Sequence, residues 1–204
     1  MKKHVLPVLV ASLTPALSSA APIDFFQLDG GSRTATVVLV KALRFSADNP
    51  APPLLSAVYS NFSTGDTAAI AYTHRWSLVQ GTHGFVVGVG AAANSFRNRD
   101  QPNEDETGVS LRGQAEAFGP APGGSYYGLV QASTFRNAWL GLIQYSPTNV
   151  PVGIEMYRQV QEGYQATTTA LRVATGIDRW FLRVGVVRTS GEYRPFVGIT
   201  FNGF

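Results

Sequence analysis

The sequence has no cysteine, few charged residues and no long hydrophobic run after its first twenty residues. Without cysteine, a disulfide scaffold is excluded, so stability must come from hydrogen-bonded structure. Charged residues make up only 14% of the chain, against roughly 25% in typical soluble domains. No stretch beyond the N-terminal segment approaches about 18 consecutive apolar residues, which excludes a transmembrane helix. Low charge without long apolar runs is typical of strands that alternate an apolar and a polar face.

Lysine is also rare. Residues 21–204 contain a single lysine, Lys41, beside 13 arginines. Once Lys2 and Lys3 are set aside, positive and negative charges nearly balance, so the overall pI of 9.3 overstates the basicity. We therefore expect no nucleic-acid partner.

The N-terminal segment has the three parts of a secretory signal peptide. Met1–Lys3 is positively charged, Val5–Leu17 is mostly apolar, and Ser18–Ala20 supplies small residues before a cleavage site. A run of 13 residues interrupted by two prolines is too short to span a bilayer. We expect cleavage near Ala20 and a single domain over residues 21–204.

The rest of the chain alternates with a period of two, which predicts strands with two unlike faces. The pattern is clearest in residues 67–78, 107–118 and the last 26 residues, where a Ser190-Gly191 turn joins two strands. Eleven strands are evident, and Ile23–Leu28 is a doubtful twelfth. If the first and last strands begin and end on the same side of a membrane, the strand number is even. We therefore expect about twelve strands, with ten as an alternative.

The turns and loops between these strands are also predicted from the sequence. Asp29–Ser32 is predicted to be a turn, and the cluster Gly119–Gly124 is predicted to end a strand, because both are rich in glycine or proline. The charge-dense segment Arg97–Glu106 is predicted to be a loop on the outside of the cell.

The signal peptide, the hairpin rhythm, the aromatic strand ends and the closing stretch Arg194–Phe204 together resemble a bacterial outer-membrane β-barrel. The resemblance implies one all-β, antiparallel transmembrane barrel in the outer membrane, in contact with its lipid and lipopolysaccharide and inserted by the barrel-assembly machinery. It assigns Phe201 and Phe204 to a C-terminal assembly signal, although Asn202 stands where such barrels usually have an apolar residue. Several aromatic residues near strand ends suit the interfacial girdles of such a barrel: Trp76, Trp139, Tyr145, Trp180 and Tyr193.

Polar residues on the opposite faces are predicted to point into the lumen. They are Arg75, Arg112, Gln114, Glu116, Glu155, Gln159 and Arg183, with Tyr157 near them. Such a set forms either a charge network that fills a narrow barrel or a selectivity lining, because an unpaired interior charge is costly. Arg158 and Arg172 fall on the faces opposite to these residues and are expected near the rim.

Candidate chemistry beyond the lumen is sparse. His74 and Ser77 lie on opposite faces of one predicted strand, so they do not form the local pair that a nucleophilic site requires. The acidic residues of the charge-dense loop lack the spacing and central glycine of a calcium loop. We expect no metal site and no cofactor.

Three functions remain open on the sequence. The first is a non-enzymatic structural or accessory component of an envelope or exopolysaccharide export system, because Trp139–Tyr157 resembles part of such barrels. The second is a narrow small-solute pore, and the third is a lipid A-modifying enzyme.

Overall fold

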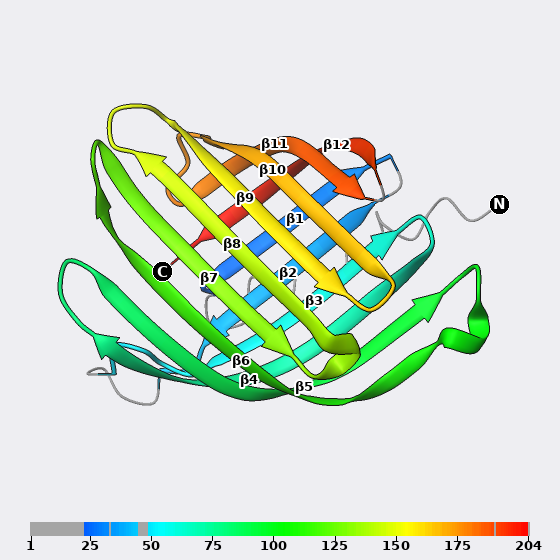
Figure 1. Cartoon of the computed structure of the whole chain (residues 1–204). Helices are drawn as coiled ribbons and strands as arrows, with labels where there is room; N and C mark the ends of the chain where they lie inside the picture. Colours follow the sequence, from blue (N-terminus) through cyan, green and yellow to red (C-terminus); the bar gives the residue numbers. More distant parts are fainter. Residues whose placement is uncertain (1–22, 33, 45–48, 190, 204) are drawn as a thin grey trace.

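The computed structural model describes residues 23–32, 34–44, 49–189 and 191–203, which form a closed antiparallel β-barrel (Figure 1). Within these residues, twelve strands follow one another around the wall, and the first closes the barrel by pairing with the last. The predicted fold class is confirmed, and the alternative of ten strands is wrong. The strands are β1 (Phe25–Gly31), β2 (Ala35–Ala42), β3 (Leu54–Phe62), β4 (Gly65–Val79), β5 (Gly84–Asn98), β6 (Glu106–Ala121), β7 (Gly124–Ser133), β8 (Ala138–Pro147), β9 (Val152–Gln161), β10 (Tyr164–Ala174), β11 (Trp180–Thr189) and β12 (Glu192–Asn202).

The barrel has two ends, which we name by the elements they carry. End A holds the start of β1 and the end of β12, where Phe25 is opposite Asn202. End B holds the loop between β5 and β6, which contains the short 3-10 helix η1 (Pro102–Glu104). A second 3-10 helix, η2 (Phe135–Asn137), makes the turn between β7 and β8 at the same end.

Three neighbouring strands are longer than the others. β4, β5 and β6 contain 15, 15 and 16 residues, whereas a tilted strand needs about 9–11 residues to cross a bilayer. The surplus lies partly at end B, where the β5–β6 hairpin projects at the right of Figure 1. The predicted loop Arg97–Glu106 is therefore confirmed in outline, although strand pairing continues to Asn98 and resumes at Glu106.

The prediction that a turn begins at Asp29 is wrong. β1 continues to Gly31, and Asp29 is paired with Gly198 on one side and Thr36 on the other. A Cβ at Gly31 would lie 2.9 Å from the carbonyl oxygen of Pro195. This glycine therefore permits close strand approach, and the turn to β2 begins at Gly31, whose N–H donates to the Thr34 carbonyl at 2.8 Å.

The prediction that the breaker cluster ends a strand at Gly119 is also wrong. β6 pairs with β7 as far as Ala121, and Pro120 is opposite Ser125. The pairing of β6 with β5 stops at Phe118. Pro120 is therefore at an edge, where its missing N–H leaves no ladder bond unmade.

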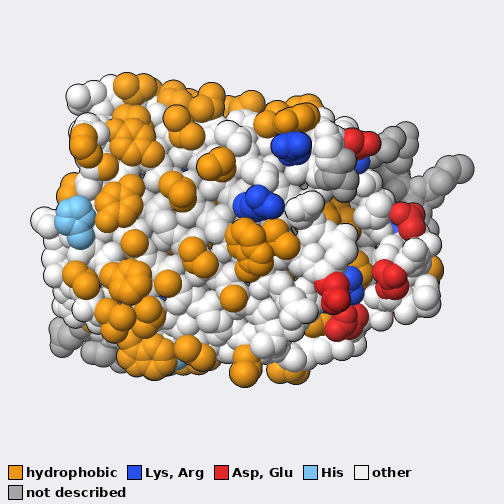
Figure 2. Space-filling model, in the orientation of Figure 1, with side chains coloured by type: hydrophobic (Ala, Val, Ile, Leu, Met, Phe, Trp, Pro, Cys, Tyr) orange, Lys and Arg blue, Asp and Glu red, His pale blue; other side chains and the backbone are white. Residues whose placement is uncertain are grey.

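The exterior of the barrel is apolar and the interior is polar. Among the large apolar side chains that face outward, Val109 is 83% exposed, Leu111 68% and Ile70 61%. Figure 2 shows hydrophobic side chains spread over the visible wall, with acidic residues gathered toward end B. Buried polar residues include Arg183, Glu155, Arg172 and Glu116. This arrangement is the reverse of a soluble protein and suits a wall that faces hydrocarbon.

The helices of the described residues are the two short 3-10 helices η1 and η2. In the described ranges, no helix is both long and apolar enough to cross a membrane.

Candidate functional site

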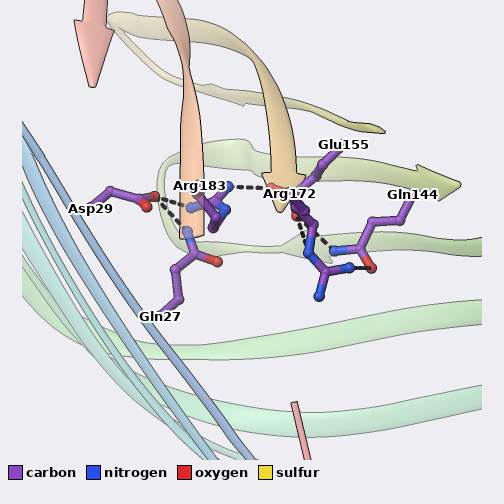
Figure 3. Close-up of polar contacts among 6 residues, drawn as sticks. All are labelled: Gln27, Asp29, Gln144, Glu155, Arg172 and Arg183. Carbon is purple, nitrogen blue, oxygen red and sulfur yellow. Dashed lines mark hydrogen bonds and ion pairs between the residues drawn. The ribbon is translucent and has the colours of Figure 1, made fainter. Parts of the chain in front are cut away.

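The lumen holds a network centred on Arg183, which we call the Arg183 cluster: Gln27, Asp29, Gln144, Glu155, Arg172 and Arg183 (Figure 3). Arg183 on β11 is fully buried and donates to Asp29 Oδ2 on β1 and to Glu155 Oε1 on β9. Gln27 Nε2 donates to the same Asp29 oxygen at 2.7 Å. Two carboxylates are thus held by one guanidinium, as the cost of an unpaired interior charge requires.

Arg172 extends this cluster across β10. Its Nη1 donates to Gln144 Oε1 at 3.2 Å, and its Nε lies 4.0 Å from Glu155 Oε2. Gln144 Nε2 in turn donates to Glu155 Oε2 at 2.7 Å. The guanidinium of Arg172 also stacks 4.4 Å from the ring centroid of Phe181. The Arg183 cluster therefore contains two arginines and two carboxylates, so its charges balance.

The expectation that Arg172 lies on the face opposite the polar residues is wrong. β10 pairs with β9 in a register that sets Ala170 opposite Glu155 and Arg172 opposite Gly153. Residues directly opposite each other point to the same side of a sheet. The even-numbered face of β10 therefore points inward with Glu155. Arg158 is on the exterior, as expected.

A second network, the Glu116 cluster, lies on β4, β6 and β7. Arg75 Nη1 is 2.9 Å from Glu116 Oε1, which also accepts a hydrogen bond from Gln114 Nε2 at 2.8 Å. Tyr127 donates to the other carboxylate oxygen at 3.0 Å. Arg75 Nε also donates to the carbonyl of Pro52 at 2.9 Å. One arginine again balances one carboxylate.

Arg112 differs from the other lumen arginines. It donates to Gln131 Oε1 on β7 and, at 3.4 Å, to Ser56 Oγ on β3. Within the described part of the chain, no carboxylate lies within ion-pair distance of Arg112 and its Nε has no hydrogen-bond partner. The lumen therefore carries a surplus positive charge at this point.

A small hollow opens toward end B beside the Arg183 cluster. It has a volume of about 40 Å³ and is lined by hydroxyl, amide and aromatic groups that include Thr36, Asn61, Tyr157, Gln159 and Gln161. A space of this size holds one or two waters. Around the Arg183 and Glu116 clusters the lumen is filled by side chains, since Arg183, Glu155, Arg172 and Glu116 are buried there.

The aromatic residues predicted for the girdles divide between the two ends. Trp76, Tyr145 and Trp180 are on strand segments near end A, whereas Trp139 and Tyr193 are near end B. Trp180 packs against Phe201, with ring centroids 5.3 Å apart. Phe204, the other residue of the predicted assembly signal, lies outside the described residues.

Asp24 joins the two chain ends of the barrel at end A. Its carboxylate accepts a hydrogen bond from the Ala42 N–H at 2.8 Å and pairs with Arg44 at 2.7 Å and Lys41 at 3.5 Å. Burial alone would raise the pKa of Asp24, but these three partners together lower it below its ordinary value. The Asp24 carbonyl also accepts the Gly203 N–H at 2.7 Å, next to the end of β12.

The remaining polar groups do not form a catalytic or metal-binding arrangement among the described residues. His74 faces outward and packs on Trp76, with ring centroids 4.6 Å apart, while Ser77 donates to the Val79 carbonyl at 3.2 Å. Among the residues whose structure is described, no group of three or more His, Cys, Asp and Glu side chains is placed to hold a metal ion.

Sequence reasoning missed several members of these clusters. Asp29 and Gln27 were hidden by the turn signal around Gly30, and Gln144, Gln131 and Tyr127 were not singled out. The available signal was the spacing of Tyr127 and Gln131, which occupy alternate positions of one strand and therefore point to the same face.

Comparison with known proteins identifies solved structures that have a similar fold. No family model matches the chain, and no curated protein matches it. Several solved structures share its architecture, and two of them are described by name. One is a KdgM porin, with a TM-score of 0.54 and 15% identity over 87% of this chain and 97% of that chain. The other is a KdgM porin in complex with disordered oligogalacturonate, with a TM-score of 0.53 and 14% identity over the same shares. The chain has the fold of a bacterial outer-membrane β-barrel, and within that class it is similar to the KdgM porins.

Proposed function

We propose that this protein is a narrow pore of the bacterial outer membrane that passes small hydrophilic solutes and favours anions. The observation that carries the proposal is the contrast between the two faces of the wall. The exterior exposes apolar side chains such as Val109 and Leu111, whereas the interior is lined by hydrogen-bonded polar groups. A polar lumen inside a closed, lipid-facing barrel is the arrangement of an aqueous pathway.

The charge of the lumen supports a preference for anions. The Arg183 and Glu116 clusters are balanced, so the surplus charge is that of Arg112, which has only neutral partners among the described residues. Rings and clusters of arginine favour anions in pores. The KdgM porin that was solved with oligogalacturonate supports the same class of solute by analogy, since galacturonate is a carboxylated sugar.

The other two functions receive less support. A lipid-modifying enzyme needs a nucleophile next to a base, yet His74 and Ser77 point to opposite sides of β4 and contact different groups. A purely structural barrel would need no surplus charge in its lumen. We therefore place the pore ahead of the structural component.

The test is the ion selectivity of the barrel in a planar bilayer that separates two KCl concentrations. Arg112→Gln removes the surplus charge and keeps the hydrogen bond to Gln131 possible. If the charge of Arg112 favours an anion over a cation in the lumen by about 1 kcal/mol, the ratio of anion to cation permeability should be about fivefold lower in Arg112→Gln than in the wild type.

The matched control is Arg158→Gln, which removes an exposed arginine from the outer face. This variant should keep the wild-type reversal potential. A wild-type barrel that carries no current, or an Arg112→Gln barrel with unchanged selectivity, would overturn the proposal.

A further inference from the structure

Two arginines face outward near end B, where lipid rather than solvent surrounds the wall. Arg158 on β9 and Arg188 on β11 are both exposed. Each is directly opposite Thr167 on the strand between them, so the three residues form a row across β9, β10 and β11. The two arginines are thus separated by two strand spacings, about 10 Å along the wall.

Aromatic residues fix the depth of this row. The guanidinium of Arg158 lies 5.9 Å from the ring centroid of Trp139, and that of Arg188 lies 5.5 Å from Tyr193. Trp139 is the second residue of β8, and Tyr193 is the second residue of β12. Aromatic residues at strand ends mark the level of the lipid headgroups, where a lipid-facing charge is tolerated.

Neither arginine is neutralised within the described part of the protein. No carboxylate there lies within ion-pair distance of Arg158 or Arg188. Glu192, next to Tyr193, instead pairs with Arg194. Two positive charges at the headgroup level are therefore available to an anion outside the barrel.

The surface between the arginines is hollowed. A concavity of about 330 Å³ is lined by both arginines together with Gln165, Thr167, Ala166 and Gly191. Its lining combines two forked cationic donors with an amide and a hydroxyl donor. Arginine forks match the oxygens of a phosphate group, which accept two parallel hydrogen bonds from one guanidinium.

We propose that this hollow, the Arg158–Arg188 site, binds the phosphate group of a lipid in the outer leaflet. A lipid is favoured over a free anion because the site opens on the apolar exterior, beside Trp139 and Tyr193, where acyl chains can pack below the headgroup. The proposal rests on the membrane placement given above and not on conduction through the lumen.

The experiment titrates the full, detergent-solubilised barrel with lipid A that carries its two phosphates and counts bound lipid by native mass spectrometry. The double variant Arg158→Gln/Arg188→Gln should retain the lipid about tenfold less well than the wild type. Lipid A stripped of phosphate should bind wild type and double variant equally. The double variant with lysine at both positions should recover part of the affinity, because it restores the charge without the fork.

Arg112→Gln is the control, because it removes an arginine from the lumen and should bind lipid A as the wild type does. Slower migration of boiled than of unheated protein in SDS confirms that each variant remains a folded barrel. Equal retention by wild type and double variant, or full displacement of lipid A by millimolar inorganic phosphate, would overturn the proposal. Because lipid is counted without any current, failure of the pore and failure of this site give different results.

Discussion

Arg183 is a buried arginine that two carboxylates hold from opposite sides. Its side chain is fully enclosed, and its ring contact with Phe196, 5.4 Å from the centroid, closes another side. Buried ion pairs add little net stability compared with an apolar core, yet loss of one partner leaves the others uncompensated. Without Arg183, Asp29 would have no cationic partner among the described residues, and Glu155 would keep only Arg172.

Arg183→Met should therefore lower the free energy of unfolding by about 3–5 kcal/mol. Urea unfolding in detergent micelles, followed by tryptophan fluorescence, measures the loss. Arg188→Gln is the matched control on the same strand, because its guanidinium is exposed, and we expect it to change stability by less than about 1 kcal/mol.

The double variant Asp29→Asn/Arg183→Met should recover part of the loss, since the remaining carboxylate, Glu155, is still paired with Arg172. An Arg183→Met barrel as stable as the wild type would show that the cluster does not hold the wall together.

For single residues, the sequence predicted which side chains point into the barrel better than it predicted which side chains contact each other. Alternation alone placed Arg183 and Glu155 on inward faces, because a strand with one apolar face must send its polar residues the other way. It could not pair them, since β9 and β11 are separated by another strand. Arg172 shows the limit most clearly, because the register between β9 and β10 decides which way it points.

The seam between β1 and β12 is the element that turns the sheet into a barrel. Gly198 on β12 is opposite Asp29 on β1. A Cβ at Gly198 would lie 2.0 Å from Asp29 Oδ1 and 2.6 Å from the Leu28 carbonyl oxygen. This close approach of the two strands lets the Asp29 carboxylate reach Arg183 across the seam.

Gly198→Ala should weaken the seam, because the added methyl group must displace either the Asp29 carboxylate or the β1 backbone. We expect a loss of about 1–3 kcal/mol, the usual cost of overpacking, in the same urea measurement. Gly113→Ala on β6 is the control, since nothing lies within 4 Å of a Cβ there. If both variants lose the same amount, the effect belongs to glycine replacement in general and not to the seam.

The Asp24 carboxylate holds the start of β1 to the end of β2 and the segment after it at end A, and its contribution depends on pH. The pKa of Asp24 is lowered in the folded protein, because the Ala42 N–H, Arg44 and Lys41 outweigh its burial. A lowered pKa means that the stabilisation is present above the ordinary pKa of an aspartate and is lost as pH falls through the folded pKa.

Asp24→Asn should therefore be less stable than the wild type at pH 7, by about 0.5–1 kcal/mol, since the partner Arg44 is largely exposed. Urea unfolding of both proteins from pH 7 to pH 2 tests the sign. The two curves should converge below about pH 4. A difference that stays constant or grows at acidic pH would contradict the role of the ionised carboxylate.

Element boundaries were predictable where turn chemistry was unambiguous. Val152–Gln161 was predicted with the bounds that the structure shows, because Glu162-Gly163 allows a tight turn, with Gly163 at a φ of 75°. The bounds of β1 and β6 were not predictable in this way. Glycine and proline in those strands serve close approach and an unpaired edge, and only the neighbouring strands reveal this.

For the whole molecule, the even strand number followed from a simple constraint on a closed, membrane-crossing wall. Closure was predicted with it, because a sheet in hydrocarbon cannot leave an edge unpaired, and the structure closes by pairing β1 with β12 although these strands are far apart in sequence. The polar interior and apolar exterior then make the barrel a candidate pathway for solutes. The buried side chains of the Arg183 and Glu116 clusters make that pathway a narrow one.

The most direct test of this account is the reversal potential of the wild-type barrel in a planar bilayer between two KCl concentrations. We predict a small, steady single-channel conductance and a reversal potential with the sign that chloride diffusion sets, because Arg112 leaves the lumen with a surplus positive charge. A barrel that migrates as folded in SDS but carries no current, or one that prefers potassium, would contradict it.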